Sequence, residues 1–316
     1  MQENIKYILY QPMHGLGVEL VCLETMLRIS NILNRTLVLP IIPKIESIDY
    51  ERGLEEYFEF RDDFKWISMK AYKLKNGNYI DKLFHILPEY KKEYNNMQIR
   101  NTHPVWLKLI EEYAYFDIMN MNVGEIKKCF VKNKLTKKNI LDLFDTDCKT
   151  IAFTYVNDLI ENKEYGIKNI SKDPFKYFIS TPDLPNKELL FKVKKYVKNK
   201  KYVAIHWRRG NNIELVKKEL MNNRGLPLWS DILKKIPKNI EYIYVASDIE
   251  ENDLLFNSSI KVIEGFKCNE DNINAIIDMC FCINADYFIG NRYSTYSNYI
   301  YHVRTLMGKK NNYMFR

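Results

Sequence analysis

The feature that most constrains the fold is a regular alternation of short apolar segments and helical patterns after about residue 185. Strands are predicted at Tyr202–His206, Tyr242–Ala246, Lys261–Ile263 and Tyr287–Ile289. Helical patterns separate them near residues 187–200, 228–236, 250–257 and 272–284, and a last helix is predicted at Thr295–Met307. Short apolar strands that alternate with helices predict a parallel sheet with both faces covered.

The N-terminal end of the chain carries a second pattern of this kind. An apolar run at Tyr7–Tyr10 is followed by a glycine-containing turn, His14–Gly17, and then by a helical pattern from Leu20 to Leu33. Thr36–Leu39 predicts a second strand, which Pro40 ends. This is one β-α-β unit. The stretch from Pro43 to Ser180 is irregular and predicts only mixed helix. Two α/β halves imply a cleft between them.

Charge and composition narrow the classes of ligand only slightly. The chain has 48 basic and 40 acidic residues, a net charge of +8, which suits an anionic small ligand as well as a nucleic acid. The lysine-rich segment Phe191–Tyr202 has apolar residues at helical spacing, which indicates a surface helix with a solvated basic face. We find no signal-like N-terminus and no apolar run of membrane-spanning length. We therefore expect no membrane segment and a cytoplasmic location.

Two arginines follow the predicted strand Tyr202–His206, in the sequence His206-Trp207-Arg208-Arg209-Gly210. Ligands of open α/β sheets bind beyond the carboxyl ends of the strands. A guanidinium offers a planar fork that matches phosphate oxygens and keeps its charge at any working pH. A surface arginine pair that closes a turn is the alternative, but the position after a strand favours a phosphate site.

A second candidate anion site lies where the predicted strand Tyr287–Ile289 meets the last helix. The segment Gly290–Ser297 reads GNRYSTYS, and Ser294 or Thr295 can cap the helix, whose free N–H groups attract anions. Capping accounts for one hydroxyl residue. The further hydroxyl residues together with Arg292 exceed what a cap requires.

Two weaker sites complete the set. Ser247-Asp248 follows the strand Tyr242–Ala246, and Asp248 can accept hydrogen bonds from a base or ribose, or equally cap the next helix. In the N-terminal turn, the glycines around Leu16 allow a sugar or phosphate to approach the backbone. His14 and Glu19 are the ionisable groups near that turn suited to general-base work.

These segments resemble the protein O-fucosyltransferase family. Its H-x-R motif after a strand reads His206–Arg208 here, and its Asp-bearing strand end reads Ser247–Asp248. Its segment A-D-x-F-I-G-N-x-x-S-S/T-F/Y-S/T reads ADYFIGNRYSTYS at Ala285–Ser297, and its L-N-R-T-L-V-L-P reads Leu33–Pro40. The resemblance covers about residues 8–60 and 200–308.

The resemblance implies two Rossmann-like domains of the GT-B type that face each other across a cleft. Residues 1–185 would form the acceptor-side domain, and residues 186–316 the domain that binds the GDP-sugar. The implied reaction moves fucose from GDP-fucose to a hydroxyl of a protein or peptide, with inversion and without a required metal or cofactor. A glycan acceptor, a different nucleotide sugar and a non-enzymatic nucleotide- or RNA-binding protein are the alternatives.

The resemblance also implies roles for single residues. Arg208 would meet the β-phosphate and the departing oxygen, with His206 beside the sugar–phosphate. Ser294, Thr295 and Tyr296 would surround the phosphates. The candidate catalytic residues are thus Arg208, His206, His14 and Glu19. The candidate donor-binding residues are Gly15, Leu16, Gly17, His206, Arg208, Arg209, Asp248, Arg292, Ser294, Thr295, Tyr296 and Ser297.

The N-terminal turn departs from the family, whose members usually have Asn or Asn-Gln where this chain has Gly17-Val18-Glu19. The acceptor hydroxyl could therefore be activated by His14, by Glu19 or by the departing phosphate. A separate triplet, Asp145-Thr146-Asp147, is the D-x-D pattern with which glycosyltransferases of another fold hold Mn²⁺. Two such aspartates also occur in ordinary loops, and nothing else in the sequence supports that fold.

Overall fold

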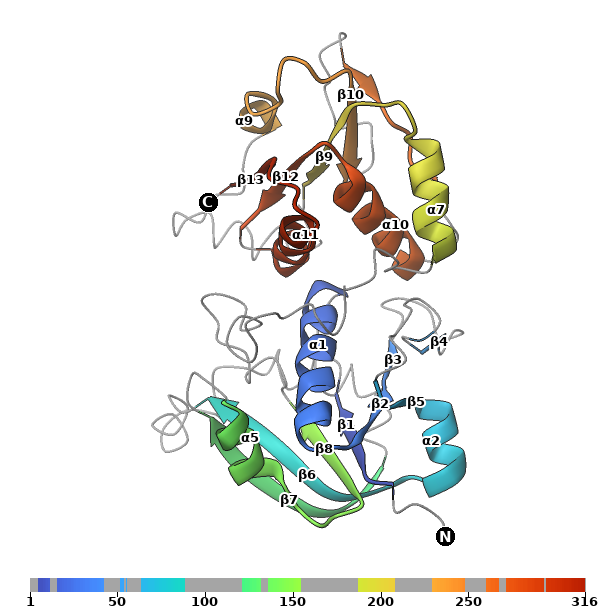
Figure 1. Ribbon diagram of the computed structural model, residues 1–316, viewed down its shortest axis with the longest axis vertical. Coiled ribbons are helices and arrows are strands. Elements are labelled where there is room, and N and C mark those ends of the chain that lie inside the picture. The colour runs from blue at the N-terminus through green and yellow to red at the C-terminus, as the bar shows by residue number, and fades with distance from the viewer. Residues whose placement is uncertain are drawn as a thin grey trace, which may run out of the picture. The chain divides into compact units, whose positions relative to one another are not determined.

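The computed structural model describes residues 5–11, 16–42, 52–53, 55, 64–88, 121–131, 136–154, 187–207, 229–247, 260–266, 271–292 and 294–315. The chain divides into two compact units, Met1–Pro182 and Asp183–Arg316, and each contains a parallel sheet (Figure 1). Among the described residues, none of the helices combines the length and the apolar character that a membrane crossing requires.

The N-terminal unit has a six-stranded sheet in the order β5-β2-β1-β8-β6-β7, with all neighbouring strands parallel. Its elements in chain order are β1 (Tyr7–Tyr10), α1 (Leu16–Ile32), β2 (Thr36–Leu39), β5 (Trp66–Ser68), α2 (Met69–Asn76), β6 (Tyr79–Pro88), β7 (Asn122–Val131), α5 (Lys137–Phe144) and β8 (Thr150–Thr154). Two further strands, β3 (Ile41–Ile42) and β4 (Arg52–Gly53), lie between β2 and β5 in the sequence and form a small antiparallel pair.

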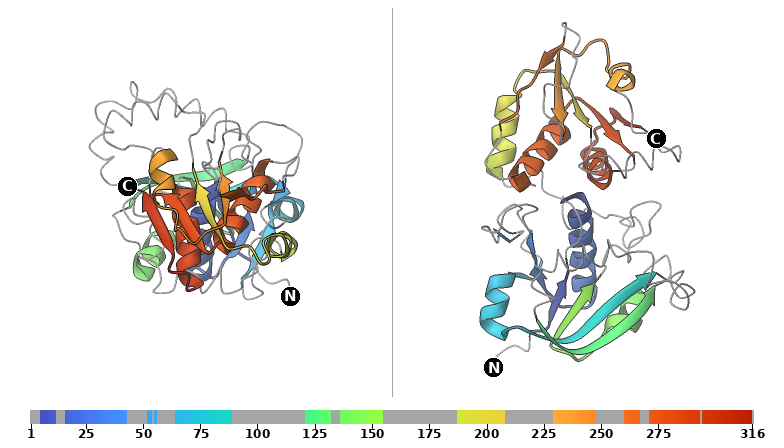
Figure 2. Two further views of the ribbon diagram at one scale, coloured as in Figure 1. Left: turned by 90° about the horizontal axis from the view of Figure 1, so that it is seen from above. Right: turned by 180° about the vertical axis from the view of Figure 1, so that it is seen from behind.

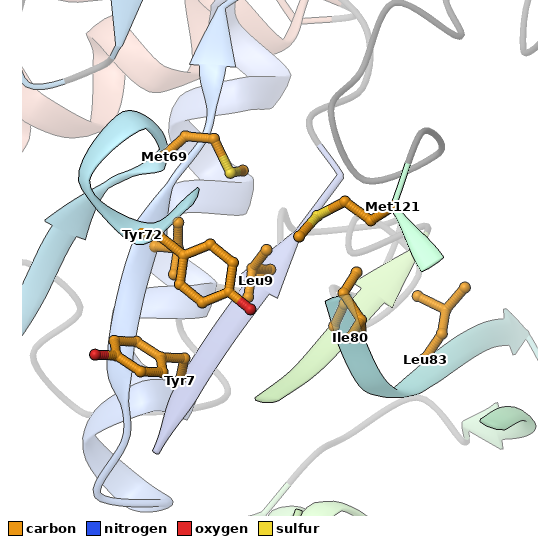
Figure 3. Packing of buried hydrophobic residues seen from close by; sticks show 9 residues of the cluster. Tyr7, Leu9, Met69, Tyr72, Ile80, Leu83 and Met121 are labelled. Atoms are coloured by element: carbon orange, nitrogen blue, oxygen red, sulfur yellow. The ribbon is translucent and has the colours of Figure 1, made fainter. Parts of the chain in front are cut away.

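Side-chain alternation along the strands sorts the core of this unit into two layers. Leu9, Leu83 and Ala152 share a buried cluster with Met69 and Tyr72 of α2 (Figure 3). On the other face, Phe84 and Phe153 pack against Phe144 of α5. Figure 2 shows α5 behind β6 and β7 when the unit is seen from behind. The sheet is thus covered on both faces, as the sequence predicts for a parallel sheet.

The motif at Leu33–Pro40 has a structural explanation. Asn34 adopts a positive φ of 51° at the turn after α1, a conformation that asparagine tolerates better than most residues. The buried guanidinium of Arg35 donates to the carbonyl oxygens of Cys148 at 2.9 Å, Thr146 at 2.6 Å and Tyr7 at 3.3 Å. Arg35 therefore links the start of β1 to the loop before β8 at the amino edge of the sheet.

The C-terminal unit has a five-stranded parallel sheet in the order β11-β10-β9-β12-β13. Its elements are α7 (Lys187–Tyr196), β9 (Tyr202–His206), α9 (Trp229–Leu233), β10 (Tyr242–Ala246), β11 (Lys261–Val262), α10 (Asp271–Asn284), β12 (Tyr287–Asn291), α11 (Thr295–Leu306) and β13 (Asn312–Phe315). Ile232 of α9 packs with Val203 and Ile205 on one face of the sheet, whereas Phe281 of α10 stacks on Tyr244 on the other.

The predicted elements at the two ends of the chain are confirmed, with bounds that differ by a few residues. The middle of the chain differs from the expectation of mixed helix, because β5, β6, β7 and β8 supply four of the six strands of the N-terminal sheet. The helix predicted at residues 250–257 lies outside the described residues.

Candidate functional site

Three of the sequence motifs contain a strand end that lies at one edge of the C-terminal sheet. β9 is paired with β10 on one side and with β12 on the other, and all three run in parallel. Their carboxyl ends, at His206, Ala246 and Asn291, therefore lie at the same edge, where ligands of open α/β sheets bind.

His206 is in direct contact with the start of α11. Its Nδ1 lies 2.6 Å from Oγ of Ser297. Its ring lies 4.7 Å, centroid to centroid, from the ring of Tyr296. Residues 91 positions apart in the sequence thus meet at one point. The structure brings the H-x-R strand end and the hydroxyl-rich helix start together.

The start of α11 is built from interlocking hydrogen bonds. Ser294 is the N-cap, and its side chain accepts from the backbone N–H of Ser297 at 3.4 Å. Oγ of Ser297 in turn accepts from the backbone N–H of Asn291 at 3.0 Å. All three residues are buried. The predicted capping role of Ser294 is confirmed, and the positive end of the helix dipole lies at the carboxyl edge of the sheet.

The other residues of this segment face different surroundings. The hydroxyl of Tyr296 donates to the backbone carbonyl of Ala275 in α10. Burial, followed by the nearby charge of Asp278, raises the pKa of Tyr296 well above its usual value. Thr295 is partly buried, and Arg292 is exposed. The Tyr296 hydroxyl therefore anchors α11 to α10, while Arg292 keeps a solvent-facing side chain.

Trp207 and Ser247 fix the neighbouring strand ends. Trp207 is buried against Trp229, and its backbone N–H donates to the carbonyl of Ala246 at 2.9 Å. Oγ of Ser247 donates to the carbonyl of Trp207 at 2.8 Å. The chain that leads into Arg208 thus leaves the sheet from a fixed position.

Gly290 lies in β12 one residue before Asn291, where space is short. A Cβ at this position would meet Sδ of Met314 at 2.8 Å and a ring carbon of Phe288 at 2.8 Å. Met314 has a flexible side chain that can move, whereas the ring of Phe288 is buried. Glycine therefore permits the close packing at the end of β12.

Replacing Gly290 with alanine is expected to lower the free energy of unfolding by about 1–3 kcal/mol, the usual effect of overpacking. Displacement of β12 should also weaken binding of GDP, the nucleotide of the donor that the family resemblance implies. Urea unfolding and calorimetric titration would measure the two effects. Adding Met314→Ala to Gly290→Ala should recover part of the lost stability, and a double variant no more stable than Gly290→Ala would contradict the steric explanation.

In the N-terminal unit, Glu19 lies in the first turn of α1 and is buried. Its Oε1 accepts a hydrogen bond from the hydroxyl of Tyr10, the last residue of β1, at 2.8 Å. Burial, and then the charge of Glu19, raise the pKa of Tyr10 well above its usual value. Glu19 is thus held at the carboxyl edge of the N-terminal sheet. Leu16 and Gly17 begin the same helix.

Tyr10 contacts the candidate residue Glu19, although the sequence predicts Tyr10 only as part of a strand. The available signal was a hydroxyl at the last strand position before a glycine turn. Five other candidates, His14, Gly15, Arg208, Arg209 and Asp248, lie outside the described residues.

The Asp145-Thr146-Asp147 triplet lies at the opposite edge of the N-terminal sheet. It precedes β8, and Asp147 pairs with Lys6, just before β1, at 3.3 Å. The backbone carbonyl of Thr146 is held by Arg35. Within the described part of the chain, no three His, Cys, Asp or Glu residues form a group that could hold a metal ion. The triplet is a loop at the amino edge, away from the carboxyl ends of the strands.

Comparison with known proteins agrees with these observations. The sequence pattern of the family described as GDP-fucose protein O-fucosyltransferase matches residues 7–307. The chain belongs to this family. The resemblance to this family is therefore confirmed. The family match indicates that the protein is an enzyme of the fucosyltransferase class.

One curated relative, GDP-fucose protein O-fucosyltransferase 2 of Caenorhabditis elegans, is 32% identical over 116 residues. The aligned part is 34% of this chain and 27% of the worm protein. The crystal structure of POFUT1 in complex with GDP matches with a TM-score of 0.63 and 16% identity over 99% of each chain. POFUT1 in complex with GDP-fucose matches with a TM-score of 0.62 and 14% identity over 99% and 98% of the two chains. At these identities the structural matches show the α/β fold with parallel sheets.

Proposed function

We propose that the protein transfers fucose from GDP-fucose to a hydroxyl of a protein or peptide acceptor. The observation that carries the proposal is the contact of His206 with Ser297 at 2.6 Å, which unites two family motifs at one sheet edge. The family match over residues 7–307 supports GDP-fucose as the donor. A fucosyltransferase that uses a glycan acceptor would present the same donor site.

The proposed reaction is an inverting displacement at the anomeric carbon. The acceptor oxygen forms a bond to this carbon as the bond to the β-phosphate oxygen breaks, and the electron pair leaves with GDP. Arg208 and the N-terminal end of α11 would stabilise the negative charge that develops on the diphosphate. Such positive groups would allow a reaction without a metal ion. The acceptor proton would pass to Glu19, to His14 or to the departing phosphate.

The proposal assigns the two units different roles. The C-terminal unit would bind the GDP-sugar, and the N-terminal unit would bind the acceptor across a GT-B type cleft. Each unit carries polar candidates at the carboxyl edge of its sheet: His206 and Ser294 in one, Glu19 in the other. The cytoplasmic location expected from the sequence stays a prediction.

The proposed donor can be tested by calorimetric titration with GDP, GDP-fucose, GDP-mannose and a UDP-sugar, each with EDTA and with Mn²⁺. We expect GDP and GDP-fucose to bind with the same affinity in both conditions. Tight binding of a UDP-sugar without binding of GDP would refute the donor assignment. Loss of GDP-fucose transfer in EDTA, restored by Mn²⁺, would refute the metal-independent reaction.

A further inference from the structure

Ser297 occupies an unusual position for a residue of a proposed nucleotide site. It lies in the first turn of α11 but has no exposed surface. Its hydroxyl is 2.6 Å from Nδ1 of His206 and 3.0 Å from the backbone nitrogen of Asn291. A side chain buried to this degree affects a bound donor through its neighbours.

The hydrogen bonds at Ser297 limit the roles that Nδ1 of His206 can take. The N–H of Asn291 can only donate, so it uses one acceptor pair of the Ser297 oxygen. A serine hydroxyl has a single proton and a second acceptor pair, so Nδ1 of His206 either accepts that proton or, when protonated, donates to the remaining pair. A neutral imidazole whose Nδ1 accepts carries its own proton on Nε2.

Other contacts restrict the orientation of the same ring. His206 ends β9 and is paired in register with Ala246 of β10. The ring of Tyr296 lies against the imidazole at 4.7 Å, and Tyr296 is itself anchored to Ala275. The backbone pairing of His206, the contact at its Nδ1 and the ring of Tyr296 thus restrict the orientation of the imidazole.

We propose that Ser297 is a positioning residue that holds His206 as the Nε2–H tautomer. The inference rests on the proposed function, in which His206 lies beside the sugar–phosphate. In this tautomer the Nε2–H group donates a hydrogen bond to an oxygen of the donor diphosphate. Ser297 fixes this donor before the nucleotide sugar binds, so the ring need not reorient during the reaction.

The test combines ¹⁵N NMR of the histidine-labelled protein, residues 1–316, with fucosyl-transfer kinetics. The chain has five histidines, and a His206→Gln variant assigns the signal of His206. We expect the nitrogen shifts of the Nε2–H tautomer in the unliganded protein. Ser297→Ala should replace them with a mixture of tautomers and lower kcat/KM about tenfold or more, an effect of the size seen when a metal-ligating histidine loses the hydrogen bond that orients it.

Two variants separate positioning from folding. Ser297→Thr keeps the hydroxyl and should retain both the Nε2–H signal and most of the activity. Ser294→Ala weakens the same helix start by removing its cap and should leave the His206 signal unchanged. An unchanged signal in Ser297→Ala would overturn the role of Ser297 while the proposed function stands. Failure of the unaltered protein to bind GDP-fucose would overturn the proposed function and, with it, the role of His206 toward a donor.

Discussion

Replacement of Arg304 by methionine is expected to lower the free energy of unfolding of the C-terminal unit by about 3–4 kcal/mol. The guanidinium has no exposed surface and donates to the carbonyls of Cys282, Ile283 and Ala285 at 2.7–3.0 Å. Burial lowers its pKa to about 10, so it remains charged at neutral pH. Methionine fills similar space but leaves buried acceptors without this donor.

The magnitude depends on what else reaches the same carbonyls. Nζ of Lys309 donates to Ile283 at 2.9 Å and to Ala285 at 3.4 Å, so part of the acceptor set keeps a partner. Nε of Arg304 also donates a hydrogen bond to Oδ1 of Asn312, at the start of β13. Its loss therefore affects the end of α10 and both following strands. A change of this size is a large part of the stability of an ordinary domain, about 5–15 kcal/mol.

Urea unfolding followed by tryptophan fluorescence would measure the effect, because Trp207 and Trp229 both belong to the C-terminal unit. Arg292→Met is the matched control, since the same substitution there removes an exposed side chain. We expect a change below about 0.5 kcal/mol for the control. Equal unfolding midpoints for the two variants would contradict the structural role of Arg304.

The sequence predicts the elements around the candidate donor site because their signals are local. The strands at Tyr202–His206 and Tyr242–Ala246 are continuous apolar runs that match β9 and β10. The N-cap at Ser294 follows from a hydroxyl residue between a strand and a helix. Patterns that depend on neighbouring residues in the chain are visible without coordinates.

Other features depend on which strands become neighbours. β7 is an edge strand whose residues Glu125, Ile126 and Lys127 are exposed, so its sequence lacks the apolar run of a central strand. The contact of His206 with Ser297 requires β9 to pair with β12, a choice that no local pattern encodes. The bond from Tyr10 to Glu19 likewise requires α1 to fold back over β1. The family resemblance suggests that the motifs form one site. The order of the strands in the sheet explains how His206 and Ser297 come into contact.

Replacement of Arg208 by alanine is expected to lower kcat/KM for fucosyl transfer about 10²–10³-fold, the usual effect of removing one donor to a developing negative charge. Arg208 lies outside the described residues, but the preceding residue is fixed by its bonds to Ala246 and Ser247 at the carboxyl edge. If the guanidinium acts mainly in the transition state, kcat and kcat/KM should fall together while the Kd for GDP-fucose changes less.

Lys201→Ala is the matched control, because it removes an exposed cation at the amino end of the same strand. This variant lowers the net charge by the same amount, so it reports any general electrostatic attraction of the donor. We expect its kcat/KM to stay within about twofold of the unaltered protein, since an exposed charge at the far edge of the sheet is screened by salt. Fucosyl-transfer kinetics and GDP-fucose titrations on both variants would separate a loss of catalysis from a loss of general electrostatic attraction for the donor. If Arg208→Ala folds normally and transfers fucose as fast as Lys201→Ala, the carboxyl edge of β9 is not where the leaving diphosphate is stabilised.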